Sequence, residues 1–136
     1  MKPNSKWIED WQIGEAPTRE RNVSRELLIL FIDFWDAQAL DDKSRTTRNR
    51  YSGSLHALGS YLVEQAIADS GLNKTTDELL SEHIGSDDGP LIFHDNEDGQ
   101  GELDTVCRKL NRHIRKNANL QVQRMEYRRC TVSFDP

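Results

Sequence analysis

Residues 44–71 read SRTTRNRYSGSLHALGSYLVEQAIADSG and carry the clearest helical pattern in the chain. The apolar positions of this pattern are Tyr51, Leu55, Leu58 and Leu62. At 100° per residue these positions fall within about 60° of one another, which is typical of the buried stripe of an amphipathic helix. We therefore predict a helix that starts near Ser44 or Thr46 and ends at Gly71. Small residues beside the stripe, Gly59 among them, favour close approach of another helix.

Three further helices are expected around this one. The first spans about Ser24 to Leu40, with Ser24 as its N-cap. A short second one follows the capping box Thr75-Thr76-Asp77-Glu78, in which Thr75 stands three residues before Glu78. The last spans about Glu102 to Asn117, and its apolar stripe comprises Leu103, Val106, Cys107, Leu110 and Ile114. The sequence thus predicts a mainly α protein, a single four-helix orthogonal bundle.

The 136 residues suit a single domain with three parts. Residues 1–22 are an N-terminal arm, in which Trp7, Ile8 and Trp11 stand at helical spacing before Gly14 and Pro17. Residues 23–118 are the helical core, including an acidic loop at 85–102 with an apolar plug at 91–93. In residues 119–136 apolar and polar residues alternate in two phases, which predicts a short extended tail of one or two strands.

Composition excludes several classes of protein. No apolar run approaches the eighteen residues of a membrane span, and the N-terminus lacks the apolar region of a secretory signal. The two cysteines, Cys107 and Cys130, have no metal-ligand spacing. A reduced cytoplasmic protein is expected, although a disulfide between them stays open.

No catalytic or metal-binding constellation is evident. His56, His83, His94 and His113 share no i, i+4 spacing, so structural roles are expected for them. The acidic loop lacks the carboxylate at position twelve that a calcium loop needs. There is no nucleophile elbow or phosphate-binding glycine loop. We therefore expect no enzyme activity, no cofactor, no metal and no small-molecule substrate.

Charge is divided unevenly along the chain. Residues 1–104 carry a net charge of −11, whereas residues 105–136 carry +6. Lys43, Arg45, Arg48 and Arg50 crowd the start of the predicted helix at 44–71, where a phosphate would meet both their side chains and the free N–H groups of the first turn. The alternative is that they pair with the preceding aspartates, which are Asp33, Asp36, Asp41 and Asp42.

The last helix offers a second basic surface. Its cations are Arg108, Lys109, Arg112, Arg115 and Lys116, on the side opposite the apolar stripe. Lys109, Arg112, Arg115 and Lys116 have no acidic neighbour four residues away on the helix, which favours a polyanion as partner, whereas Arg108 follows Asp104 by four residues. Mutual neutralisation of the acidic and basic parts of the chain on folding is the alternative.

The helix at 44–71 also carries the spacing T-x3-Y-x3-L-x2-L-x2-[aromatic]-L, running from Thr47 through Tyr51 to Leu62. This resembles the N-terminal core-binding domain of tyrosine recombinases (phage-type integrases), a SAM-like four-helix domain, over about residues 24–117. In that family the second and fourth helices lie against DNA. The resemblance implies DNA-backbone contacts for Arg45, Arg48, Arg108, Arg112 and Arg115. The family's catalytic domain is absent here, so strand cleavage does not carry over.

Two functions follow as hypotheses. The first is a non-catalytic module that binds DNA through the two basic helix surfaces. The second is a protein-interaction or homo-oligomerisation module with no nucleic-acid role, in which Trp7 and Trp11 would anchor a partner.

Overall fold

The computed structural model describes residues 2–68, 71–85, 89–93 and 95–133, with side chains as far as residue 116. Within these ranges the protein is mainly α, as predicted, and no strand occurs. The helices are α1 (Lys6–Asp10), α2 (Pro17–Ala37), α3 (Arg45–Ile67), α4 (Thr76–His83) and α5 (Glu97–Ser133), with one 3₁₀ turn, η1 (Leu40–Asp42). None of the helices in the described part of the chain is long and apolar enough to cross a membrane.

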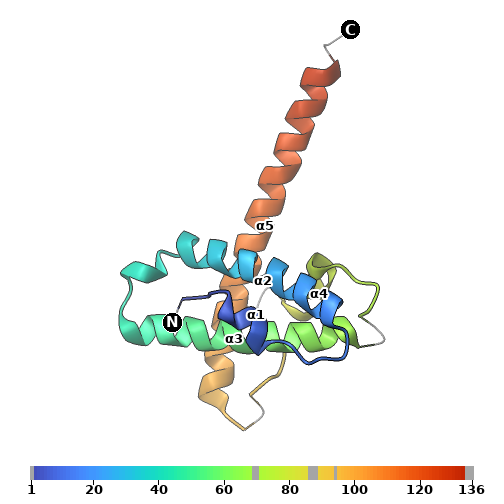
Figure 1. The fold of residues 1–136 in the computed structure, drawn as a ribbon. Helices are drawn as coiled ribbons and strands as arrows, with labels where there is room; N and C mark the ends of the chain where they lie inside the picture. Colours follow the sequence, from blue (N-terminus) through green and yellow to red (C-terminus); the bar gives the residue numbers. More distant parts are fainter. Residues whose placement is uncertain (1, 69–70, 86–88, 94, 134–136) are drawn as a thin grey trace.

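The bundle is built around α3 (Figure 1). Helices α2 and α3 run antiparallel and are joined by η1, α1 lies against them, and α5 crosses them steeply before it leaves the bundle. The predicted stripe of α3 is the centre of the core, since Leu55, Leu58 and Leu62 have no exposed surface. Burial of each such side chain stabilises the fold by about 2 kcal/mol.

The start of α3 confirms the sequence prediction. Ser44 is the N-cap, and its hydroxyl accepts a hydrogen bond from the N–H of Thr47 at 3.2 Å. The helix ends at Ile67, four residues before the glycine that was predicted to stop it. The capping box of α4 is also confirmed, because Thr75 Oγ1 accepts from the N–H of Glu78 at 3.1 Å.

Helix α2 begins seven residues earlier than predicted. Pro17 occupies its first turn, where the fixed φ of proline suits a helix and its missing N–H costs nothing. Ser24 is therefore not an N-cap but a buried position inside the helix. The N-cap is Ala16, without a side-chain cap, and the carboxylate of Glu20 instead accepts hydrogen bonds from the N–H groups of Ile13, Gly14 and Ala16 in the turn before the helix.

The N-terminal arm packs on the bundle. Trp7 is 4% and Trp11 2% exposed, and the Trp11 indole N–H donates to the carbonyl of His56 at 3.0 Å. The Trp11 ring lies directly against Gly59 of α3, in space that a Cβ atom would occupy. The small residue on α3 thus admits the tryptophan that directly follows α1.

Helix α5 is longer than predicted at both ends. It starts at Glu97, so the end of the acidic loop at 85–102 is helical, and it continues to Ser133. The extended or β tail predicted at 119–136 is therefore wrong as far as residue 133, and residues 134–136 lie outside the described residues. Residues 119–133 contain no glycine or proline and are rich in helix formers, which outweighs the short alternating runs.

The apolar plug at 91–93 is confirmed in part. Ile92 and Phe93 pack against the core, whereas Leu91 is 62% exposed. The side-chain oxygen of Gln100 accepts hydrogen bonds from the N–H groups of Ile92 and Phe93, each at 3.1 Å. These bonds tie the loop to the first turns of α5.

Candidate nucleic-acid interface

A cleft of about 370 Å³ lies where α2 ends and α3 begins. The chain reaches α3 through Ala39, which adopts the left-handed conformation (φ 52°), and through η1. The residues lining the cleft are Lys2, Trp35, Asp41, Arg45, Arg48 and Asn49. This cation cleft therefore contains two of the basic residues that charge pattern alone had selected, Arg45 and Arg48.

The acidic side chains near the cleft are engaged by Lys2 and Trp35. Lys2 Nζ lies 3.2 Å from Asp36 Oδ1 and 3.6 Å from Asp41 Oδ2. The indole N–H of Trp35 donates to Asp41 at 2.9 Å and is the main cause that holds the pKa of Asp41 below its ordinary value. The charges of Lys2 and Arg48 act in the same direction, so Asp41 is an anion at neutral pH.

The basic residues at the start of α3 do not pair with the preceding aspartates. Asp33 instead meets His113 of α5, with 2.8 Å between Oδ2 and Nε2. Among the described residues, Lys43, Arg45 and Arg48 have no carboxylate within 4.0 Å. Within the same part of the chain, Arg48 Nε is buried and has no hydrogen-bond acceptor. The exposed side chains of Lys43 and Arg45 are therefore open to an outside anion.

The basic face of α5 adjoins the same region. Its five cations span about 120° of the helix at 100° per residue. Lys109, at the edge of this arc, donates to Tyr51 Oη at 2.8 Å and its ammonium lies 5.5 Å from the centre of the tyrosine ring. Tyr51 is one turn beyond Arg48 on α3, so the two basic surfaces meet there.

The remaining cations of α5 point away from the core. Arg112, Arg115 and Lys116 are exposed, and Arg108 is half-buried. Within the described part of the chain none of these four has an acidic partner within 4.0 Å. Glu102, at the end of the acidic loop, pairs with Arg50 at 3.3 Å instead. In the described part of the acidic loop, Glu102 thus partly neutralises Arg50, and no carboxylate of that part lies within 4.0 Å of a predicted site residue.

Three residues of the cleft were not predicted from the sequence. Lys2 comes from the N-terminus and Trp35 from α2, and no local spacing relates them to α3. Asn49 could have been identified from the sequence, since it follows Arg45 by four residues and so shares its helix face. The predicted anchor residues Trp7 and Trp11, in contrast, are buried in the core, so a partner would reach them only after the arm detached.

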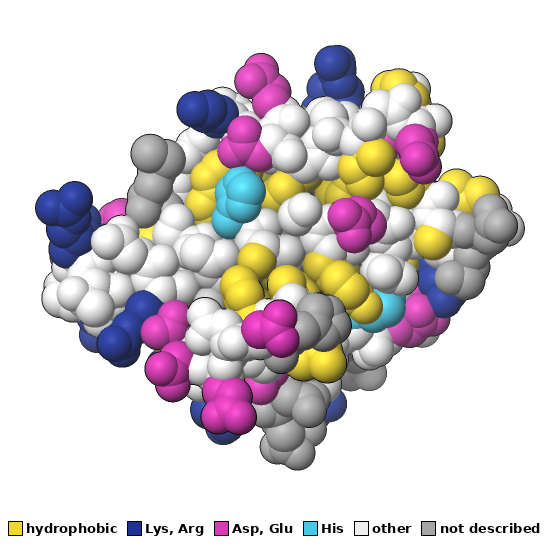
Figure 2. All heavy atoms as spheres, turned by 90° about the horizontal axis from the view of Figure 1, so that it is seen from below, with side chains coloured by type: hydrophobic (Ala, Val, Ile, Leu, Met, Phe, Trp, Pro, Cys, Tyr) yellow, Lys and Arg dark blue, Asp and Glu magenta, His cyan; other side chains and the backbone are white. Residues whose placement is uncertain are grey.

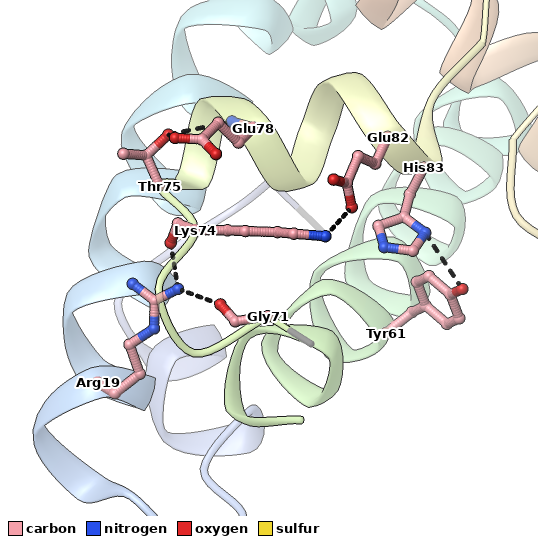
Figure 3. A network of polar contacts seen from close by, with 8 residues as sticks. All are labelled: Arg19, Tyr61, Gly71, Lys74, Thr75, Glu78, Glu82 and His83. Atoms are coloured by element: carbon pink, nitrogen blue, oxygen red, sulfur yellow. Dashed lines mark hydrogen bonds and ion pairs between the residues drawn. The ribbon is translucent and has the colours of Figure 1, made fainter. Parts of the chain in front are cut away.

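A second polar cluster joins α2, α3 and α4 (Figure 3). The guanidinium of Arg19 donates to the carbonyl groups of Ala66, Gly71 and Lys74. Lys74 pairs with Glu82 at 2.6 Å, and the Tyr61 hydroxyl lies 3.4 Å from His83 Nδ1 (Figure 3). Burial lowers the pKa of His83, which favours its neutral form. These contacts fasten the α3–α4 connection to α2.

The described histidines have structural partners, which fits the sequence prediction. His56 Nε2 lies 3.2 Å from Asp10 Oδ2, while His83 and His113 make the contacts given above. His94 lies outside the described residues. In the part of the chain that the structure describes, no three His, Cys, Asp or Glu side chains are grouped as a metal site requires. The side chain of Cys130 is also outside this part, so its pairing with Cys107 stays open.

Comparison with known proteins identifies no relative of this chain. No protein-family model, curated protein or solved structure matches the chain.

Proposed function

We propose that this protein is a non-catalytic, cytoplasmic module that binds nucleic acid, with DNA as the expected form, through phosphate contacts. The observation that carries the proposal is the set of cations at the start of α3 that lack an acidic partner among the described residues. Lysine and arginine side chains held in this way attract the phosphate backbone irrespective of base sequence.

The geometry supports a joint surface. The contact of Lys109 with Tyr51 places the basic face of α5 beside the first two turns of α3. We propose that Arg48 on one helix and Arg112 on the other contact phosphates of the same backbone. The resemblance to the recombinase core-binding domain selects the same two helices, and it is an argument independent of charge.

The negative net charge of the whole chain opposes binding at long range. At physiological ionic strength, however, charges more than about 8 Å apart are largely screened. A local group of unpaired cations therefore dominates contact with a phosphate, and the acidic parts of the chain mainly lower the rate of association.

Salt dependence of binding tests the proposal. We expect a fluorescein-labelled 20-base-pair duplex to bind at low salt, with a logarithmic slope of affinity against salt of about −0.9 per phosphate contacted. About five contacts would give a slope near −4.5. Absence of any anisotropy change at 20 mM salt would remove the proposal.

A protein partner is the second candidate function, and it concerns another face. Figure 2 shows apolar side chains in two bands on the face seen from below, and the Lys and Arg side chains visible there lie at its margins. Apolar surface gathered in this way is typical of protein contacts. Sedimentation velocity without nucleic acid would reveal self-association, and a strictly monomeric species would exclude that form of the candidate.

A further inference from the structure

Helix α5 continues far beyond the bundle. Its described core residues end at Ile114, and Figure 1 shows the rest of the helix projecting away from the other elements. Residues 117–133, the projecting segment, extend for about 25 Å at the rise of an α-helix. An isolated helix of this size is marginally stable in water, because most helices of proteins depend on the packing of an apolar face. The projecting segment therefore needs a surface to pack on.

The apolar stripe of α5 continues into the projecting segment. Within the bundle the stripe includes the buried residues Leu103, Cys107 and Leu110, followed by Ile114. The same steps of four, three and four residues lead on to Ala118, Gln121, Met125, Arg129 and Val132. A repeat of this kind, with eleven residues in three turns, keeps its positions on one side of the helix. The side of α5 that packs in the core is therefore continued outside the bundle by five positions, three of them apolar.

These five positions are symmetric about Met125. Ala118 and Val132 stand seven residues to either side of it, and Gln121 and Arg129 stand four residues to either side. Met125 is also the midpoint of residues 117–133. Two copies of the projecting segment that lie antiparallel about Met125 therefore overlap along their whole length.

This antiparallel register brings complementary residues together. Ala118 would lie opposite the partner's Val132, a small residue facing a larger one, as interdigitated packing requires. Gln121 would lie opposite the partner's Arg129, whose guanidinium can donate to the amide oxygen. The two polar residues of the stripe would thus satisfy each other.

The charges of the segment favour the same direction. Arg124 and Glu126 flank Met125, so that in an antiparallel pair each would meet the opposite charge on the partner. A parallel pair would instead place Arg129 opposite the partner's Arg129, and like charges that face each other destabilise a contact. The sequence of the segment is therefore complementary to itself in the antiparallel direction only.

From these observations we propose that residues 117–133 pair antiparallel with the same segment of a second copy, so that the protein forms a two-fold symmetric dimer. This inference goes beyond the proposed function and does not depend on nucleic acid. The bundle retains its described core in the monomer, so we expect the dimer to dissociate before the bundle unfolds.

Sedimentation velocity of the full chain at increasing concentration, without nucleic acid, tests the pairing and its face. We expect dimers at about 300 µM, and we expect Met125→Glu to weaken dimerisation at least about tenfold, because it places two carboxylates at the centre of the pair. Tyr127→Glu is the matched control, since residue 127 lies about 200° around the helix from residue 125, and it should change the dissociation constant by less than about threefold.

Two outcomes of this measurement would overturn the proposal. A wild-type chain that stays monomeric at the highest concentration would show that the segment does not pair. An effect of Tyr127→Glu equal to or larger than that of Met125→Glu would show that another face of α5 makes the contact.

Disulfide cross-linking tests the direction of the pair. In a Cys130→Ser background, a mixture of Ala118→Cys chains with Val132→Cys chains should form a cross-linked dimer under mild oxidation. Either chain alone should form none, because its two new cysteines would lie about 21 Å apart, beyond the reach of a disulfide. Cross-links in the separate chains, or none in the mixture, would contradict the antiparallel register.

Discussion

Glu20 is a charged side chain with no exposed surface, and three N–H groups surround it. Burial alone would raise its pKa, but the hydrogen bonds from Ala16, Ile13 and Gly14 outweigh burial and lower the pKa below its ordinary value of 4.5. The carboxylate thereby fastens the turn between α1 and α2, which holds the arm on the bundle.

Replacement of Glu20 should show this role. We expect Glu20→Gln to lower the free energy of unfolding by about 2 kcal/mol at pH 7, since an amide offers one acceptor oxygen in place of two. Urea denaturation measures the loss. The exposed Glu26→Gln on the same helix is the control and should change stability by less than about 0.5 kcal/mol.

The pH dependence of stability follows from the direction in which folding shifts the pKa of Glu20. The pKa of Glu20 is lower in the folded protein than in the unfolded chain. The stability that its carboxylate contributes is therefore fully present at pH values above the unfolded pKa, and it is lost as the pH falls through the folded pKa. We therefore expect the difference in stability between the wild type and Glu20→Gln to shrink below about pH 4. A constant difference from pH 7 to pH 3 would contradict the assignment.

Two glycines of α3 form a natural comparison. A Cβ at Gly59 would overlap the Trp11 ring, whereas one at Gly53 meets nothing within 4 Å. We expect Gly59→Ala to destabilise the protein by about 1–3 kcal/mol and Gly53→Ala to stabilise it by about 0.5–1 kcal/mol. Thermal unfolding of the two variants measures the contrast. Equal shifts would show that Trp11 does not pack against α3 in solution.

At the scale of elements, some boundaries could be predicted and others could not. The starts of α3 and α4 were predicted because Ser44 and Thr75 are local caps, readable from a few residues. The start of α2 was not, because no side chain caps it and Glu20 instead binds N–H groups of a preceding turn whose path depends on packing of the arm. The tail was predicted to be extended because its short runs of alternating apolar and polar residues fit the period of a strand and that of a helix equally well.

Helix α5 has two parts with different consequences. The described core residues that it supplies end at Ile114, and the helix then leaves the bundle (Figure 1). We expect a chain ending after Lys116 to keep its melting temperature within about 2 °C, because it retains every core side chain that the structure describes. Far-ultraviolet circular dichroism should show less helix, as residues 117–133 are helical in the full chain.

A shorter chain is the control for this truncation. Ending the protein after Arg108 removes Leu110, which has no exposed surface, together with Ile114. Loss of two apolar side chains from the core costs several kcal/mol, comparable with the whole stability of a small domain. We expect no cooperative unfolding transition from it. A similar loss in the chain ending after Lys116 would mean that the outer part of α5 supports the fold.

At the scale of the whole molecule, α3 is both the centre of the core and the start of the candidate site. Its stripe packs inward, and its first turns hold Arg45 and Arg48 beside the cleft. Sequence reasoning found these arginines because charge and helix position are local properties. It could not show which acids would meet Lys2, Arg50 or His113, since those pairs join residues more than thirty positions apart.

The central claim is that the cations of α3 and α5 that lack an acidic partner among the described residues bind nucleic-acid phosphates. Its most direct test is the affinity for one duplex of two double variants with equal charge change, Arg112→Glu with Arg115→Glu on α5 and Arg21→Glu with Arg25→Glu on α2. All four positions are exposed. We predict that the α5 pair weakens binding at least about tenfold and makes the salt slope shallower by about two contacts, while the α2 pair changes affinity by less than about threefold. Equal losses in the two variants would show that binding follows net charge alone and would contradict the account.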